Sequence, residues 1–499
     1  MSRRLAALLC ALGLLLGCRS GPTPAADERP SASIAPSSPP PASPPPPASP
    51  RPPALAAAPV TGEALLPSGL RVVVAEHHQR PTVAFRLHLP RGSLTDPPRG
   101  EGTTLLAAAL ATDFREQGAD GEELVEEKSL RRQFVERGGS LAIEVGADAV
   151  ALEATGYAGD APGLLRLLAG AVTRLRHGAR SFSGRRNGLL DRIEDLEAWE
   201  MEALMELVAQ TSFGPGHPYA RPVHGTTASL TPLGLEDVVH HQRALFSPAG
   251  ATLVIVGDVR ASALLREART AFGGWSGEPL PAPTVPSPPV PHRPAEVAFL
   301  RRQPAATLQT CATRPLSDVR GAGEALEVLA RVIGGGPASR LARAVRENAG
   351  LSYSAEAFVI RRRQARTFAA CATVAGASSE AGVRVVREVL AGIRQGPLGD
   401  AEIERARGQR LAELETAWES SGRILETWTE ALVLGSGTPS PERQRAELER
   451  VTPAEVRALA QRILAPESLR WLLSGDRLAA ARAIETNRLG QLAPIDLRR

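Results

Sequence analysis

Lysine is nearly absent from this chain, since Lys128 is the only lysine among 58 basic residues. Aromatic residues are also scarce, at 4% of the 499 residues, and no basic stripe interleaved with aromatics occurs. The formal charge of +4 is slight for this length. These features argue against a nucleic-acid partner, and the arginine bias is typical of a GC-rich coding sequence. A hydrophobic content of 43% is ordinary for a globular protein.

No spanning helix is expected at the N-terminus, although a short apolar run occurs there. Arg3 and Arg4 precede the apolar stretch 5–16, which is too short to cross a bilayer and is typical of an export signal. The stretch leads into Gly17-Cys18, which resembles the bacterial lipobox, in which the cysteine is lipidated. We therefore expect a lipoprotein signal peptide over residues 1–17 and lipid attachment at Cys18. A plain signal peptide with an incidental cysteine is the alternative.

Cysteine is rare as well, with four in the chain. Cys10 would leave with the signal peptide and Cys18 would carry lipid, so Cys311 and Cys371 remain. Both lie in similar strand-like contexts, and outside the cytoplasm they could form a disulfide. Because the sequence cannot supply the Cα separation that a disulfide needs, a disulfide and two buried free cysteines both stay open.

Proline-rich segments divide the chain. Residues 18–60 are dominated by proline, alanine and serine, a composition that predicts a disordered tether between membrane and folded part. A second proline-rich stretch, 279–294, predicts a linker between two halves of similar length. The expected domains are therefore 61–278 and 295–499, because 499 residues exceed what one core usually holds.

The two halves repeat one another. In each, an aspartate precedes a glycine-led helix, a Thr-Pro pair predicts a later helix start, and an apolar run into Gly-Asp predicts a buried strand entering a turn. The landmarks are Asp96, Thr231-Pro232 and Gly257-Asp258 in the first half, and Asp318, Thr452-Pro453 and Gly475-Asp476 in the second. Matched landmarks in the same order indicate duplication.

Within each half, strand-like and helix-like segments are mixed. Residues 70–76 and 82–89 predict a strand pair, and 141–157 alternates as strands do. Asp160-Ala161-Pro162 opens a segment with apolar residues on a helical period. These features predict an α+β fold, with helices against one face of a largely antiparallel sheet.

The segments 66–74 and 92–96, followed by Gly102, resemble the start of the pitrilysin/insulinase family of zinc peptidases, which includes the mitochondrial processing peptidase. In that family the helix after the glycine carries an inverted zinc motif, His-x-x-Glu-His. Here the first two metal ligands fall on Leu105 and Ala109, and the general base falls on Ala108. None of these side chains can donate an electron pair to zinc or take a proton from water.

No small shift of the alignment restores the motif, because no histidine occurs between His88 and His177. The family's third ligand, a glutamate, would fall within 185–197, where Asp191 or Arg192 stands. We therefore expect this chain to bind no metal and to hold no catalytic residue of its own.

The second half keeps a better match to the family. The segment 334–353 contains Ser-Arg-Leu, Arg-Glu and Gly-Leu-Ser-Tyr, close to the family pattern. In the family, an arginine and the tyrosine seven residues later face the zinc and hold the substrate backbone. These positions are Arg346 and Tyr353. The alternative is structural: a helix stop and strand start, with Arg346 in a surface ion pair.

The resemblance implies two homologous α/β-sandwich halves of the LuxS/processing-peptidase type that form a clam-shaped chamber. It also implies a non-catalytic subunit that positions extended peptide substrates, with zinc held only by a homologous partner subunit in a heterodimer. The alternative function is a metal-free peptide-binding or scaffold protein, which would capture peptides by strand addition. The expected location is the cell envelope, lipid-anchored and facing the periplasm. Arg19 does not resemble an inner-membrane retention signal, so the outer membrane is favoured.

Overall fold

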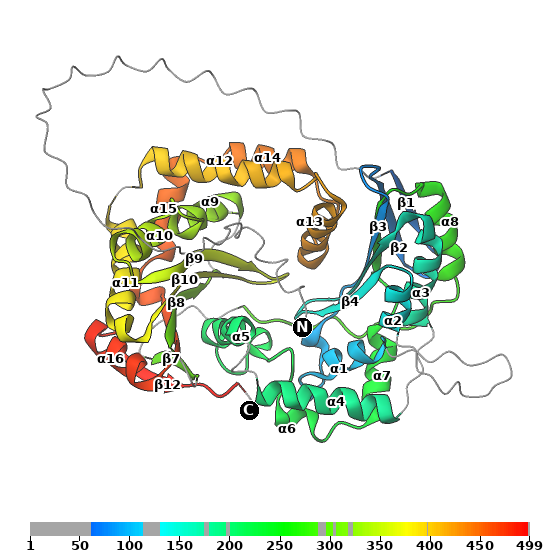
Figure 1. Cartoon of the computed structure of the whole chain (residues 1–499), viewed down its shortest axis with the longest axis horizontal. Coiled ribbons are helices and arrows are strands. Elements are labelled where there is room, and N and C mark those ends of the chain that lie inside the picture. The colour runs from blue at the N-terminus through cyan, green and yellow to red at the C-terminus, as the bar shows by residue number, and fades with distance from the viewer. Residues whose placement is uncertain are drawn as a thin grey trace, which may run out of the picture. The chain divides into compact units, whose positions relative to one another are not determined.

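Two six-stranded sheets with helices packed on them make up the described part of the chain (Figure 1). All described residues belong to one compact unit, Ala54–Arg499. The mixed α/β architecture in two halves confirms the predicted fold class. The computed structural model describes residues 61–112, 130–173, 179–195, 200–287, 296–302, 306–317, 323–396 and 398–497.

The first sheet has the strand order β1-β2-β6-β3-β5-β4. Only β2 and β6 run parallel, and the other neighbours are antiparallel. Strand β6 is buried along its whole length, as its unbroken apolar run predicts. The strands are β1 (Gly62–Leu65), β2 (Arg71–Glu76), β3 (Thr82–Leu89), β4 (Ser140–Val145), β5 (Val150–Tyr157) and β6 (Thr252–Gly257).

The second sheet repeats this order as β12-β7-β11-β8-β10-β9. The outer strand differs, because β12 comes from the chain's end and pairs parallel to β7, whereas β1 pairs antiparallel to β2. The shared order of the other five strands confirms the predicted duplication. The strands are β7 (Glu296–Arg301), β8 (Thr307–Pro315), β9 (Ser352–Arg361), β10 (Arg366–Ala375), β11 (Arg470–Gly475) and β12 (Gln491–Pro494).

Two local predictions are wrong. Strands β2 and β3 do not pair with each other, because β6 lies between them, parallel to β2 and antiparallel to β3. Thr231 does not start a helix either. It is the C-cap of α6 (Thr227–Leu230), and the next helix, α7, starts after Gly234. The matching Thr452 does cap α15, where its Oγ1 accepts a hydrogen bond from the Glu455 amide at 3.2 Å.

Helices cover one face of each sheet and bury its apolar side chains. On the first sheet α1, α3, α7 and α8 share one core with β2, β3, β5 and β6. On the second, α9, α11, α12, α15 and α16 do the same. The first-half helices are α1 (Thr103–Leu110), α2 (Leu130–Glu136), α3 (Ala161–Thr173), α4 (Ala179–Glu194), α5 (Glu200–Phe213), α6 (Thr227–Leu230), α7 (Leu235–Leu245) and α8 (Ala261–Ala271). The second-half helices are α9 (Gly323–Gly334), α10 (Arg340–Ala342), α11 (Ser379–Gln395), α12 (Asp400–Thr416), α13 (Ser421–Leu434), α14 (Pro441–Glu449), α15 (Pro453–Ile463) and α16 (Arg477–Asn487).

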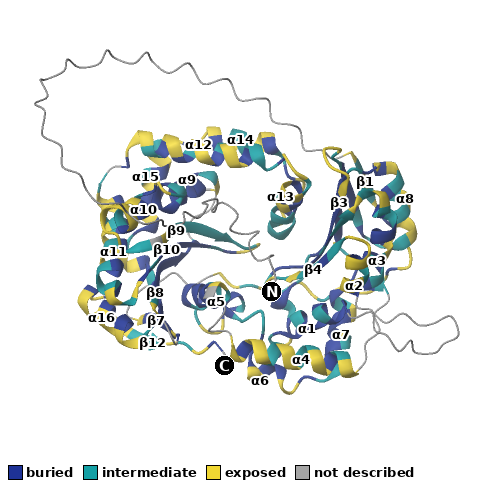
Figure 2. Cartoon of the chain, in the orientation of Figure 1, coloured by how far each residue is buried: buried dark blue, intermediate teal, exposed yellow. Residues whose placement is uncertain are grey.

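Each half also lends one helix to the other half's sheet. Helix α5 packs on the second sheet, where Leu207 meets Leu300 and Leu472 in a shared cluster. Helix α13 packs on the first sheet, where Trp428 is fully buried among residues that include Val254. The strands beneath both helices are largely buried (Figure 2). This exchange fixes the two halves to each other through apolar contact.

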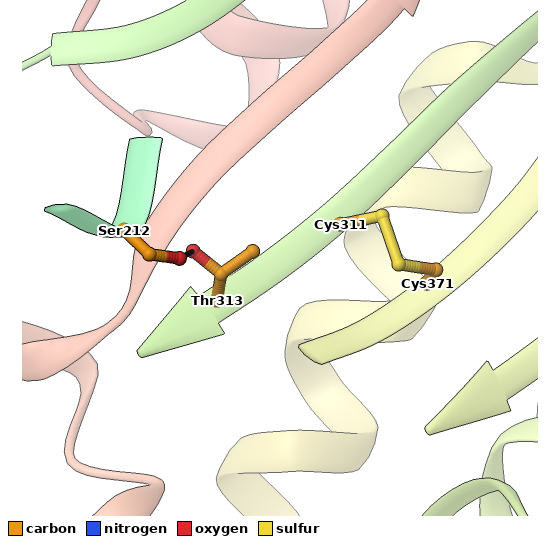
Figure 3. The surroundings of a disulfide bond; sticks show 4 residues. All are labelled: Ser212, Cys311, Thr313 and Cys371. Carbon is orange, nitrogen blue, oxygen red and sulfur yellow. Dashed lines mark hydrogen bonds between the residues drawn. A yellow bond between two sulfur atoms is a disulfide. The ribbon is translucent and has the colours of Figure 1, made fainter. Parts of the chain in front are cut away.

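A disulfide lies beneath α5. Cys311 on β8 and Cys371 on β10 stand directly opposite each other, with Cα atoms 4.1 Å apart, and their sulfurs are bonded. The side chain of Ser212, at the end of α5, donates a hydrogen bond to Thr313 at 3.1 Å nearby (Figure 3). Of the two alternatives left open by the sequence, the structure therefore has the disulfide.

The predicted signal peptide, Cys18 and the whole predicted tether, 18–60, lie outside the described residues, which begin at residue 61. The linker 279–294 is described as far as residue 287, and the matched Asp318 falls in a gap. Among the described helices, none is long and apolar enough to cross a membrane.

Candidate functional site

Helix α1, where the zinc motif would lie, is held at its start by a buried carboxylate. Asp96 accepts hydrogen bonds from the backbone amides of Gly102 at 2.9 Å and Thr104 at 2.7 Å, two groups that a helix start leaves free. Burial raises the pKa of Asp96 to about 6, although these hydrogen bonds oppose the shift. Gly102 has φ of 90°, and a Cβ there would lie 2.9 Å from the Gly225 Cα, so glycine is required.

The side chains at the motif positions are aliphatic and packed. Leu105 and Ala109 are half-buried and lie one turn apart, so they share a face of α1. Ala108 is fully buried in the core of the first half. These positions therefore present only hydrocarbon, which offers no lone pair to a cation and no acceptor for a proton.

The opposite face of α1 packs on α7 through hydrogen bonds. Thr104 Oγ1 lies 2.9 Å from His241 Nε2, and Gln242 donates to the Ala107 carbonyl at 2.6 Å. Burial lowers the pKa of His241 to about 4, so its ring is neutral at physiological pH. The adjacent His240 is exposed, as expected for neighbours on a helix. The helix is thus packed as a structural element on this side.

The region of the third ligand gives no substitute. Asp191 and Arg192 are both exposed on α4, and Arg192 forms an ion pair with Glu202 at 3.2 Å. Across the described ranges, no group of three or more His, Cys, Asp or Glu side chains is placed to hold a metal ion.

Two further histidines, His78 and His217, make local contacts. His78 lies 2.7 Å from Asp258 and 3.4 Å from Glu76, and the hydrogen bond with Asp258 is the main reason that its pKa is raised. His217 Nε2 lies 3.1 Å from the Pro286 carbonyl. These pairings account for two histidines that could otherwise be considered as ligands.

The predicted substrate residues lie in a different backbone environment. Arg346 belongs to η6 (Arg343–Asn348), a π-helical turn, and its carbonyl accepts a hydrogen bond from the Gly350 amide at 3.1 Å. Gly350 takes the left-handed conformation that ends the turn. Such turns are rare and are frequent at functional sites.

Arg346 differs from the arginines beside it. Arg340 and Arg343 both pair with Glu402, at 2.7 Å and 3.0 Å. Arg346 is exposed and forms no ion pair with any other residue that the structure describes. The surface ion pair of the structural alternative is therefore not found among those residues, and the guanidinium is available to a ligand.

Tyr353 lies where the ladder between β9 and β10 is irregular. Thr373 pairs with Ser354 while Val374 pairs with Ser352, so Tyr353 is an extra residue in its strand, a β-bulge. Bulges are over-represented next to active sites, where they redirect a side chain. The Tyr353 side chain itself lies outside what the structure describes. Arg346 and Tyr353 thus share one short segment with two backbone irregularities.

Sequence reasoning misses a buried polar joint between the halves, formed by the turn between β9 and β10. Tyr219 donates from its hydroxyl to Asp148 at 2.7 Å and accepts from the Gln364 amide at 3.2 Å. The Arg363 amide donates to the other oxygen of Asp148 at 3.1 Å, and the Arg362 guanidinium stacks 4.8 Å from the Tyr219 ring centre. The joint anchors the hairpin that carries Tyr353 to the first half.

Comparison with known proteins agrees with this picture. A family described as "Peptidase M16 inactive domain" matches residues 232–410. An uncharacterized zinc protease of Streptomyces coelicolor is 25% identical over 283 residues, which cover 56% of this chain and 61% of that protein. An uncharacterized zinc protease of Mycobacterium tuberculosis is 26% identical over 311 residues, or 61% of this chain and 70% of that protein. The chain thus matches less than two thirds of the Streptomyces relative.

Solved structures share the fold. A peptidase M16 inactive domain from Pseudomonas fluorescens aligns with a TM-score of 0.70 at 18% identity, covering 83% of this chain and 98% of that one. A protease from Helicobacter pylori aligns with a TM-score of 0.72 at 15% identity, with the same coverage. The arrangement in two halves is consistent with that fold. Together, the sequence and structural matches support the resemblance to the insulinase-family (M16) peptidases, and the described helices carry no zinc motif.

Proposed function

We propose that this chain is the non-catalytic, substrate-positioning subunit of a heterodimeric insulinase-family zinc metallopeptidase in the bacterial cell envelope. The observation that carries the proposal is a contrast within the chain. Helix α1 has hydrocarbon at Leu105, Ala108 and Ala109. The segment with Arg346 and Tyr353, in contrast, has a guanidinium without an ion pair among the described residues, beside two backbone irregularities.

The chemistry of the retained residues suits substrate positioning. The Arg346 guanidinium is a fixed fork of donors that can hold backbone carbonyls of an extended peptide. A tyrosine hydroxyl at 353 can donate a hydrogen bond to the oxyanion that develops at the scissile carbonyl. The partner subunit would supply zinc and the general base, so this chain would contribute orientation and electrostatics.

Two features support a place in the cell envelope. The N-terminal sequence is typical of a lipoprotein signal ending at Cys18, followed by a tether. The buried Cys311–Cys371 disulfide is of the kind that persists in oxidising compartments and is rare in the cytosol. The proposed location is therefore lipid-anchored and periplasmic, at the outer membrane.

Co-purification followed by a peptide-cleavage assay tests the function. The full chain is combined with a zinc-bearing homologue from the same genome, and cleavage of a fluorogenic extended peptide is measured. We expect cleavage that falls about 100-fold when Tyr353 becomes phenylalanine, in line with the loss of one oxyanion donor. Tyr157, which is 63% exposed, gives a matched Tyr157→Phe control that should leave the rate unchanged. Equal activity of the Tyr353→Phe and parent complexes would rule out the role.

The second candidate is a metal-free peptide-binding or scaffold protein that acts without a catalytic partner. Among the described strands, β4 and β9 each lie at one edge of a sheet, and this favours the second candidate, because an extended peptide can add to such an edge as a further strand. A stable monomer that binds extended peptides, with no zinc-bearing homologue recovered from pull-downs, would support this candidate over the first.

A further inference from the structure

The β-bulge at Tyr353 is closed by one side chain, that of Ser352. The Ser352 hydroxyl accepts a hydrogen bond from the Ser354 amide at 3.0 Å and lies 2.7 Å from the Ser354 carbonyl. It also donates toward the carbonyl of Thr373 on the neighbouring strand. The three contacts surround the backbone of Tyr353, which the bulge leaves outside the regular ladder.

We propose that Ser352 is the positioning residue for Tyr353. A short hydroxyl that bonds to the backbone two residues ahead offers the chain an alternative to regular pairing. Here the Ser352 hydroxyl bonds to the backbone of Ser354 within the bulge and to the Thr373 carbonyl on β10. These bonds fix the position of the Tyr353 backbone in the strand. This inference rests on the proposed function for the role of Tyr353 in catalysis. The geometry of the bulge does not depend on that function.

The neighbouring serine provides a matched control. Ser354 is exposed, and among the described residues only its backbone amide and carbonyl take part in the hydrogen bonds of the bulge. Removing its hydroxyl should therefore leave the bulge unchanged. Ser352→Ala removes all three contacts, whereas Ser352→Thr keeps a hydroxyl and suits a strand.

Fluorine NMR of the full chain labelled with 3-fluorotyrosine tests the position directly, because the chain has three tyrosines. The Tyr353 signal is identified by its loss in Tyr353→Phe. We expect Ser352→Ala to shift or broaden this signal while those of Tyr157 and Tyr219 stay in place and report an intact fold. Ser352→Thr and Ser354→Ala should keep the parent spectrum. An unchanged Tyr353 signal in Ser352→Ala would overturn the proposal; Ser352→Gly gives the same test if the alanine variant does not fold.

The cleavage assay with the zinc-bearing homologue separates this inference from the proposed function. We expect Ser352→Ala to lower kcat about tenfold with KM unchanged, because a misplaced oxyanion donor acts in the transition state, and Ser352→Thr to restore it. If Tyr353→Phe is harmless, the proposed function fails, and the NMR result still decides whether Ser352 fixes the bulge. If Tyr353→Phe is damaging but Ser352→Ala is not, the positioning role fails and the proposed function stands.

Discussion

The two halves share one strand order but differ where a peptidase of this family would do its chemistry. In the first half, α1 is regular, capped by Asp96 and packed on α7. In the second, the segment that leads into β9, the strand matching β4, has a π-helical turn at Arg346 and a bulge at Tyr353. The comparison teaches that the motif positions of the first half are occupied by ordinary packing, whereas irregular backbone marks the predicted substrate residues of the second half.

The largest expected effect is the loss of stability when a buried side chain of α1 is truncated, which measures how tightly this helix is packed in the core. Leu106 is fully buried. The adjacent Leu105, which lies on the face where the family's zinc ligands would fall, is half-buried. We expect Leu106→Ala to lower the free energy of unfolding by about 2–5 kcal/mol through the cavity it leaves, and Leu105→Ala to cost much less. Urea titration of both variants measures this. Equal losses would mean that the ligand face is as tightly packed as the core.

The two exchanged helices offer a second comparison. Helix α5 lies over the Cys311–Cys371 disulfide, whereas α13 lies on a sheet without one in its described residues. Replacing both cysteines by alanine should lower stability by about 2–4 kcal/mol, because the disulfide closes a loop of 60 residues in the unfolded chain. Denaturation with and without reductant is the measurement. If reductant destabilises the double alanine variant as much as the parent, the disulfide is not the cause.

The cap of α1 should make the stability of the first half depend on pH. Burial raises the pKa of Asp96 to about 6 from the ordinary value of 3.8, so between these pH values the folded chain binds more protons than the unfolded one. The contribution of protonated Asp96 to the free energy of unfolding is therefore complete below about pH 4. This contribution, roughly 1–3 kcal/mol, is lost as the pH rises through about 6. The free energy of unfolding of the Asp96→Asn variant, measured across the same pH range, should not show this loss. Parallel pH profiles for both proteins would contradict the assignment.

The smallest expected effect separates Arg346 from its paired neighbours. Arg346→Ala should leave the unfolding free energy within about 0.5 kcal/mol of the parent, yet weaken partner-assisted cleavage about tenfold through lost substrate contacts. Arg343→Ala is the matched control, since its pairing with Glu402 makes it structural. Thermal melts and cleavage rates for both variants are compared, and a control that loses as much activity would show that the charge of the segment matters rather than Arg346.

Much of the fold follows from the sequence because duplication repeats its signals. The apolar runs into Gly257 and Gly475 both form the buried central strands, and Thr452-Pro453 starts a helix as its capping chemistry requires. Thr231-Pro232 misleads because Gly234 lies close by and starts the next helix instead. Local signals are reliable only where no neighbour competes.

Long-range features could not be predicted in this way. The insertion of β6 between β2 and β3 joins segments far apart in the chain, and no local pattern specifies it. The exchange of α5 and α13 and the pairing of Cys311 with Cys371 depend on tertiary register. Arg346 and Tyr353 could be picked out by resemblance, but the π-helical turn and the bulge that hold them are properties of the folded backbone.

The zinc content of the purified full-length protein tests the central contrast most directly. After incubation with zinc and removal of the free ion, elemental analysis should find far less than one zinc per chain, because α1 presents only aliphatic side chains at Leu105, Ala108 and Ala109. One zinc ion per folded chain, bound in the absence of any partner, would contradict the account.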